Sequence, residues 1–143
     1  MQQAPKTIYL KRADYETIVN EAKIQAPLEA CGLVAGIDEG EQIRRICKVY
    51  VLKNTDQSAE HFSLDPKEQL EAVKDMRRRG LTPLGNWHSH PATLSRPSEE
   101  DKRLAFDKNA SYLILSLAGE EPVLNAFHIE NGNSRTEHLE IIE

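Results

Sequence analysis

The chain of 143 residues is acidic, with 18 lysines and arginines against 23 aspartates and glutamates and a formal net charge of −5. This balance argues against a nucleic-acid partner, because proteins that bind nucleic acids usually present a strongly basic face. No apolar run approaches the roughly 18 residues that a membrane-spanning helix needs, so no membrane partner is expected either. The length fits one domain over residues 1–143 that can fold without a structural metal, so a bound metal would serve chemistry.

The N-terminus and the cysteines indicate a cytoplasmic protein. Residues 1–6 lack the apolar centre of a signal peptide. Cys31 and Cys47 are too far apart in the sequence for a redox pair and match no zinc-finger pattern. Both lie on apolar segments, as expected of buried, reduced thiols.

The first third of the chain predicts a short strand, a helix and a hairpin of two strands. Ile18, Val19 and Ala22 recur at helical spacing, and Pro27 ends that helix. An apolar run with two glycines follows and leads into the turn residues 38–40. The expected ranges are 8–10 (strand), 13–25 (helix), 30–37 (buried strand) and 43–51 (strand).

The middle of the chain predicts a second helix. Residues 54–60 are polar and indicate a loop, and residues 61–64 predict a short strand. Asp65 and Pro66 are residue types favoured at the N-cap and first position of a helix, and Gly80 is typical of the residue that follows one. The expected buried face of this helix consists of Leu70, Val73 and Met76.

The last part of the chain is rich in strands. A strand is expected to end just before the segment His88-Ser89-His90-Pro91, and a loop then leads into a helix. The dipeptide Asn131-Gly132 is a typical hairpin turn. Because strands and helices alternate early and strands cluster late, we expect an α/β (α+β) fold with a mixed sheet flanked by helices. The expected ranges are 81–87 (strand), 98–106 (helix), and 112–117, 123–129 and 135–141 (strands).

His88 and His90 are separated by one residue at the end of a predicted strand. On an extended segment two such side chains leave the same face, with Cα atoms roughly 6.5 Å apart, and can bind one small cation. Pro91 cannot continue a strand ladder, so the pair should face a loop, where functional sites concentrate. A chance pair of histidines is the competing interpretation, since the motif is weak by itself.

Ser98 and Asp101 allow two interpretations. A serine followed by acidic residues behind Pro97 is typical of a helix start, with Ser98 as the N-cap and the acids in the first turn. That interpretation needs no metal. The same positions would also direct the Ser98 hydroxyl and the Asp101 carboxylate toward the end of the preceding strand. Two histidines and one carboxylate are a common ligand set of a catalytic zinc ion, which keeps a fourth position for water.

Such a site also needs a general base, and Glu29 is the best candidate. It directly precedes the apolar strand predicted for residues 30–37, as an acid at the edge of the core would. Glu21 and Glu60 lie in a predicted helix and a polar loop and have weaker claims. The competing interpretation is that Glu29 is an ordinary exposed acid.

Taken together, these residues resemble the JAMM (MPN+) zinc metallopeptidase family. The pattern is a Glu before a Cys-Gly apolar strand, then His-Ser-His-Pro, with seven residues between the second His and a Ser, and two between that Ser and an Asp. The resemblance extends to Gly85 and to segments on both sides of the motif, and is greatest to the prokaryotic stand-alone members. Those segments are Asn54 with 62–66, and 112–117.

The resemblance implies a curved mixed sheet with flanking helices, similar to cytidine deaminases. It implies one zinc ion bound by His88, His90 and Asp101, with Glu29 as the general acid/base and Ser98 stabilising the tetrahedral intermediate. The implied substrate is the C-terminal tail of a ubiquitin-like or sulfur-carrier protein joined to cysteine or lysine. The chain is too short for the insertions with which deubiquitinases of the family bind linked ubiquitins.

Other functions remain open at this stage. The family's fold also serves as a non-catalytic binding or scaffold module, and a zinc amidase acting on small peptides would use the same chemistry. A nucleoside deaminase is excluded, because it also needs a Pro-Cys-x-x-Cys motif, which this sequence lacks. A protein substrate is expected to bind as an extended strand along a sheet edge.

Overall fold

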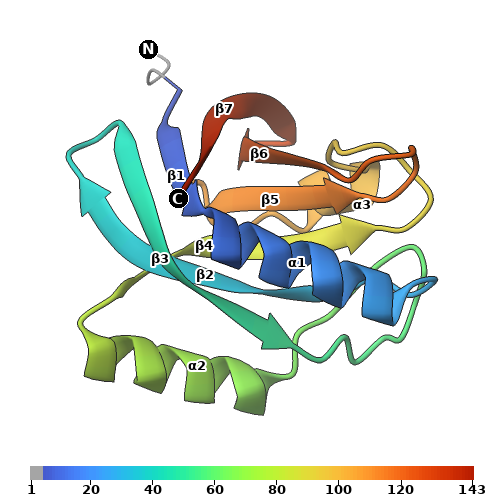
Figure 1. Ribbon diagram of the computed structural model, residues 1–143, viewed down its shortest axis with the longest axis horizontal. Helices are drawn as coiled ribbons and strands as arrows, with labels where there is room; N and C mark the ends of the chain where they lie inside the picture. The colour runs from blue at the N-terminus through green and yellow to red at the C-terminus, as the bar shows by residue number, and fades with distance from the viewer. Residues whose placement is uncertain (1–4) are drawn as a thin grey trace.

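A computed structural model describes residues 5–143 and contains seven strands and three helices. Figure 1 shows β1 beside the C-terminal part of β7, with which it pairs. The strands are β1 (Thr7–Lys11), β2 (Cys31–Glu39), β3 (Ile43–Leu52), β4 (Thr82–His90), β5 (Ser111–Ser116), β6 (Val123–Glu130) and β7 (Asn133–Ile142). The helices are α1 (Arg12–Gln25), α2 (Pro66–Arg79) and α3 (Glu99–Arg103).

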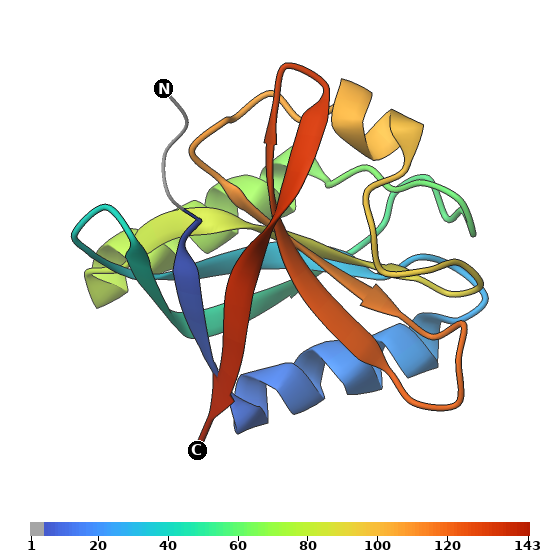
Figure 2. The ribbon, with the colours of Figure 1, turned by 90° about the horizontal axis from the view of Figure 1, so that it is seen from above.

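The strands form one mixed sheet that closes on itself in the order β1-β3-β2-β4-β5-β6-β7. β1 runs parallel to both β3 and β7, and β4 runs parallel to β5, whereas the other pairs are antiparallel. Figure 2 shows the strands crossing one another at large angles, as they do in a strongly twisted sheet. The predicted mixed sheet with flanking helices is confirmed. Its closure into a barrel was not predicted, because hydrophobic patterns show which face of a strand is buried and not which strands pair.

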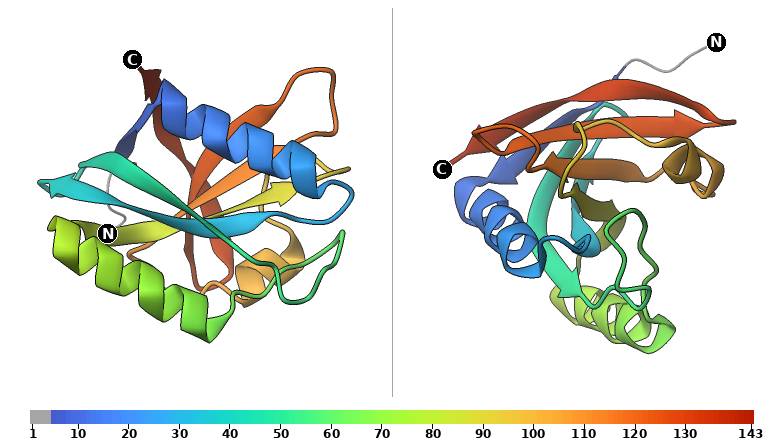
Figure 3. Two further views of the ribbon diagram at one scale, coloured as in Figure 1. Left: turned by 60° about the horizontal axis from the view of Figure 1, so that its bottom comes forward. Right: turned by 90° about the vertical axis from the view of Figure 1, so that its right-hand side faces the viewer.

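The two long helices cover opposite faces of the sheet region formed by β2, β3 and β4 (Figure 3). α1 contributes Ile18, Val19 and Ala22 to the main core inside the curve of the sheet. α2 packs on the outer face through Ala72 and Met76. Within residues 5–143, no helix has the length and apolar character needed to cross a membrane.

The predicted ends of α2 are confirmed, but the prediction that Leu70 belongs to its buried face is wrong. The Asp65 carboxylate accepts a hydrogen bond from the Lys67 amide, and Gly80 closes the helix in the left-handed conformation with φ 70°. Leu70, expected in the core, is 54% exposed. The helix instead buries Ala72 and Met76, because its docking against β2 turns the Leu70 side of the helix away from the core.

Three further predictions are corrected around the motif. β4 continues through His90 instead of ending at residue 87, because β5 pairs with it as far as Ser116 opposite His90. Residues 61–64 form no strand, and only Leu64 makes a bridge, to Asn54. α3 stops at Arg103 instead of extending to residue 106, since it buries no residue that could hold a longer helix in place.

Candidate metal centre

The C-terminal end of β4 presents both histidines of the motif on one face. His88 is paired with Cys31 of β2 and with Ile114 of β5, so its backbone is fixed from both sides. His88 and His90 are 2% and 5% exposed. The predicted placement of the pair at a strand end, facing a loop, is confirmed.

The start of α3 supplies the third polar group. Ser98 Oγ accepts a hydrogen bond of 3.0 Å from the Asp101 amide, and Asp101 Oδ2 accepts one of 2.9 Å from the Ser98 amide. These reciprocal bonds are the capping box expected if the two residues merely start a helix. The same Asp101 Oδ2 also faces both histidines. Capping and the approach to the histidines therefore coexist, and the capping box holds the carboxylate in place.

The three side chains converge to a spacing that fits a metal ion. His88 Nε2 lies 3.1 Å from His90 Nε2, and each of these nitrogens lies 3.2 Å from Asp101 Oδ2. A tetrahedral ion with ligand bonds of about 2.0–2.1 Å places its ligand atoms about 3.3 Å apart. Among the described residues, these three form the group whose ligand atoms are close enough to share an ion.

Neighbouring groups orient both imidazole rings. His90 Nδ1 lies 2.8 Å from the Leu94 carbonyl oxygen, which can only accept a hydrogen bond. The ring hydrogen of neutral His90 is therefore on Nδ1, and Nε2 keeps a lone pair directed at the shared point. The His88 ring stacks on Phe62 with centroids 4.6 Å apart. Within residues 5–143, His88 Nδ1 is buried without a hydrogen-bond partner.

The charges in the cluster favour a site ready for a cation. Burial lowers the pKa of His88, which keeps that ring neutral and able to act as a ligand. Burial alone would raise the pKa of Asp101, but its hydrogen bonds with His88 and His90 outweigh this and hold the pKa well below its usual range. A neutral imidazole and an ionised carboxylate are the forms that bind metal ions, and these are the forms favoured for His88 and Asp101. Burial opposes it, but the hydrogen bonds of His90 with Asp101 and Leu94 raise the pKa of His90, so a metal bound there would displace a proton that is held more tightly than usual.

Glu29 is buried, so the interpretation as an ordinary exposed acid is wrong. It is 3% exposed, and its Oε1 has no hydrogen-bond partner among the described residues. Burial raises the pKa of Glu29 to about 8, although the charge of His90 opposes the rise and that of Asp101 adds to it. A carboxyl whose pKa lies near neutrality can both accept and return a proton, as a general acid/base must.

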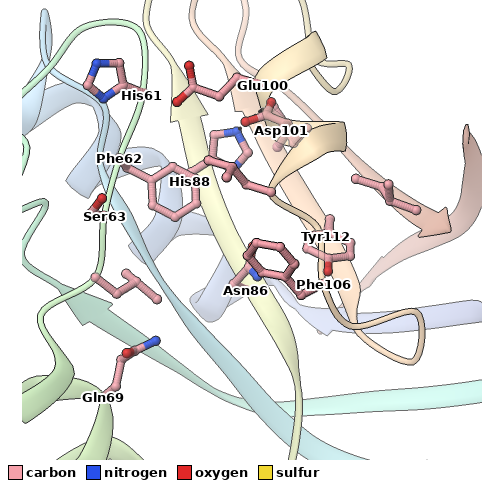
Figure 4. Close-up of a pocket in the computed structure, with 14 residues that line it drawn as sticks. His61, Phe62, Ser63, Gln69, Asn86, His88, Glu100, Asp101, Phe106 and Tyr112 are labelled. Carbon is pink, nitrogen blue, oxygen red and sulfur yellow. Dashed lines mark hydrogen bonds and ion pairs between the residues drawn. The ribbon is translucent and has the colours of Figure 1, made fainter. Parts of the chain in front are cut away.

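A pocket of about 370 Å³ opens beside the cluster, with His88 and Asp101 in its wall. Figure 4 shows Phe62 on one side of His88 and Asp101 on the other, with Phe106 and Tyr112 farther along the wall. Phe106 is 87% exposed. The pocket combines an apolar wall with the polar cluster at one end, an arrangement typical of a ligand site.

Comparison with known proteins assigns the chain to a family. The family model described as prokaryotic homologs of the JAB domain matches residues 11–130. The chain belongs to this family. A JAB1/MPN domain protein from Archaeoglobus fulgidus has the same fold, with a TM-score of 0.56 and 22% identity over 94% of this chain and 97% of that one. The expected family resemblance and fold are thus confirmed.

Several of the proteins that this chain is similar to are named as enzymes that cleave protein conjugates or are known as solved structures. The CysO-cysteine peptidase of Mycobacterium tuberculosis is 30% identical over 141 residues, which cover 96% of this chain and 94% of the relative. The desampylase of Pyrococcus furiosus is 32% identical over 74 residues, covering 52% of this chain and 49% of that protein. A solution structure from Desulfitobacterium hafniense matches with a TM-score of 0.88 and 50% identity, covering 95% and 93% of the two chains.

Sequence reasoning assigned no role to several residues that shape this JAB-family site, although Asn54 and Phe62 lie in segments that carry the family resemblance. The Leu94 carbonyl orients His90, Phe62 stacks on His88, and Phe106 lines the pocket. Asn54 bonds the backbone of Glu29. A backbone carbonyl carries no sequence signal, and the resemblance marks the segments that contain Asn54 and Phe62 without showing which residues they contact.

Proposed function

We propose that the chain is a zinc-dependent peptidase that hydrolyses a peptide or isopeptide bond at the C-terminal tail of a ubiquitin-like or sulfur-carrier protein. The convergence of His88 Nε2, His90 Nε2 and Asp101 Oδ2 within 3.2 Å of one another carries the proposal. The relatives support the substrate class: one is named a CysO-cysteine peptidase, and another a probable TtuB-protein conjugate cleaving protease.

In the proposed mechanism His88, His90 and Asp101 hold the metal, which when bound polarises the scissile carbonyl and acidifies water. Glu29 accepts the proton of the attacking water and returns it to the leaving amine. Ser98 Oγ accepts the Asp101 amide hydrogen, so its own hydroxyl hydrogen is available to stabilise the developing oxyanion. One such hydrogen bond typically contributes about 3–4 kcal/mol to catalysis.

The substrate tail is proposed to lie in the pocket beside His88. Strand addition, expected at a sheet edge, is not available at β4, because β2 and β5 already pair with its end on both sides. The pocket lies between residues 61–64 and the segment that contains Leu104 and Phe106. An extended tail fits this arrangement, and the exposed Phe106 ring offers it an apolar contact.

The burial of Glu29 favours this proposal over a non-catalytic scaffold. A module that only binds a partner has no use for a buried carboxyl without a hydrogen bond, since such burial is costly. The site retains this carboxyl together with all three metal ligands.

The test is hydrolysis by the purified chain with one zinc ion per protein. Three substrates are compared: a carrier protein with cysteine joined to its C-terminus, the same carrier joined to a lysine side chain, and a short peptide amide. Release of intact carrier, abolished by a chelator and restored by Zn²⁺, is expected for one or both adducts. Cleavage of the short peptide alone would indicate a small-peptide amidase. If the protein neither binds zinc nor cleaves any of the three substrates, the scaffold function is favoured instead.

A further inference from the structure

The loop of residues 54–64 connects the end of β3 to α2 and is organised by the side chain of Asn54. This residue is 9% exposed, and all four hydrogen-bonding positions of its amide are used. Oδ1 accepts from the amides of Asp56 and Ser63, at 3.0 and 3.1 Å. Nδ2 donates to the carbonyls of Glu29 and His61, both at 3.1 Å. One side chain thus joins both ends of the loop to Glu29, two residues before the start of β2.

The backbone of Glu29 is held on both sides by this loop. Its amide donates to the Ser58 carbonyl at 2.7 Å, and its carbonyl accepts from Asn54 Nδ2. The Glu29 side chain is held less firmly, because within residues 5–143 its Oε1 makes no hydrogen bond. The position of this carboxyl therefore depends on how firmly its peptide groups are held.

The same loop also contacts the proposed metal-ligand cluster, which consists of His88, His90 and Asp101. Phe62, next to the His61 carbonyl that Asn54 bonds, stacks on the His88 ring. Asn54 accordingly links the proposed general base to the aromatic ring that packs against a metal ligand. A loop that merely connects two elements does not need a buried, fully bonded amide at this point.

We infer that Asn54 is a positioning residue of the reaction: through the 54–64 loop it holds Glu29 at the distance from the metal site that proton transfer requires. This inference rests on the proposed function. A buried carboxyl gains hydration by turning toward water, so its burial must be enforced by the surrounding backbone. Misplacement of a reacting group by about 1 Å can lower a rate by roughly 100-fold.

The test is Asn54→Asp, which keeps the shape and both acceptor bonds but loses both donated bonds. With zinc content unchanged, we expect kcat to fall by about 10- to 100-fold and KM to change little. Asn20→Asp, the same substitution at an exposed position of α1, is the matched control and should leave both constants unchanged. If Asn54→Asp does not fold, it is replaced by Asn54→Ser, which also removes the two hydrogen bonds that the amide donates but introduces no charge.

Two measurements separate positioning from a merely structural role. In a Glu29→Gln background, Asn54→Asp should lower the remaining activity by less than about 3-fold, because residues that act as a unit are not additive. Amide hydrogen exchange of Glu29 should become faster in Asn54→Asp while the amides of β5 stay protected. Losses of equal size in both backgrounds, or unchanged exchange at Glu29, would overturn the inference. Wild-type protein that cleaves no substrate would refute the proposed function, while the exchange measurement would still test whether Asn54 holds Glu29.

Discussion

Two clusters of buried polar side chains can be compared: the proposed metal-ligand cluster of His88, His90 and Asp101 at the C-terminal end of β4, with Glu29 near it, and a second cluster around Arg44. In the Arg44 cluster every nitrogen of the guanidinium has an acceptor, and Ser111 passes a further hydrogen bond on to Glu137. Its acceptors are Asp38 Oδ1, the Leu84 and Asn109 carbonyls, and Ser111 Oγ. In the metal-ligand cluster three ligand atoms face one another, and within residues 5–143 both Glu29 Oε1 and His88 Nδ1 lack partners.

Whether the buried polar atoms have hydrogen-bond partners distinguishes groups that stabilise the fold from groups that are available for chemistry. A buried charge whose hydrogen bonds are all made is neutral or favourable to folding and is costly to disrupt. Buried groups left without partners cost stability, and they persist where a ligand or a reaction uses them. The following predictions test this contrast, from the largest expected effect to the smallest.

Asp101→Ala removes one of the three proposed ligands and should abolish both stoichiometric zinc binding and hydrolysis. Catalytic zinc sites need three protein ligands, and two histidines do not retain the ion. Zinc is measured by elemental analysis after dialysis. Glu99→Ala, in the same turn but with a side chain that is 93% exposed, is the control and should keep one zinc ion per chain. Full zinc content in Asp101→Ala would reduce Asp101 to a capping residue.

Glu29→Gln should keep one zinc ion per chain but lower kcat by about 1,000-fold, within the range expected for loss of a general acid/base. The amide has the same shape and cannot accept the proton of the attacking water. Glu21→Gln serves as the control, because that carboxylate lies on α1 and bonds Gln25. Activity within a few-fold of wild type would remove Glu29 from the mechanism.

Arg44→Met should destabilise the fold by about 3–5 kcal/mol, because it breaks a buried ionic network and leaves its partners unpaired. Zinc content and kcat per folded molecule should stay unchanged. The neighbouring Arg45→Met provides the comparison: its side chain is 44% exposed, against 6% for Arg44, and its ion pair should contribute at most about 1 kcal/mol. Denaturant unfolding measures both. Equal losses in the two variants would contradict the contrast between the clusters.

The metal-free protein should lose stability as pH rises, through the ionisation of Glu29. Burial raises the pKa of Glu29 from 4.5 to about 8, so between these values the carboxyl ionises in the unfolded state but not in the folded one. Glu29→Gln does not titrate, so its melting temperature should increasingly exceed that of wild type as pH rises, with the difference levelling off above about pH 8. The melting curves are recorded with chelator present. If the difference in melting temperature does not depend on pH, ionisation of Glu29 does not destabilise the folded protein.

Phe106→Ser should raise KM for the carrier adduct by about 10-fold and leave kcat and stability nearly unchanged. The ring is 87% exposed, so its loss removes little from the fold, whereas it lines the pocket where the tail is proposed to bind. Ile24→Ser on α1, also highly exposed, is the control. An unchanged KM would place the tail elsewhere.

Local signals in the sequence were enough to predict most of the helices and strands. Asp65, Pro66 and Gly80 marked the ends of α2, and the Asn131-Gly132 turn marked the last hairpin. Leu70 and the 61–64 strand were predicted wrongly, because docking against neighbouring elements decided which residues of α2 are buried and whether a segment finds a pairing partner.

The sequence alone determined which residues could hold an ion: two histidines at strand spacing, and an aspartate whose place in the chain also makes it a helix-start acid. It could not decide between capping and ligation for Asp101, or between an exposed and a buried Glu29. The tertiary structure showed that Asp101 caps α3 and also faces both histidines, and that Glu29 is buried, because the pairing and packing of the strands fix where β4, α3 and the start of β2 lie. Distances across the fold depend on strand pairing and packing, which the order of residues in a single chain does not reveal.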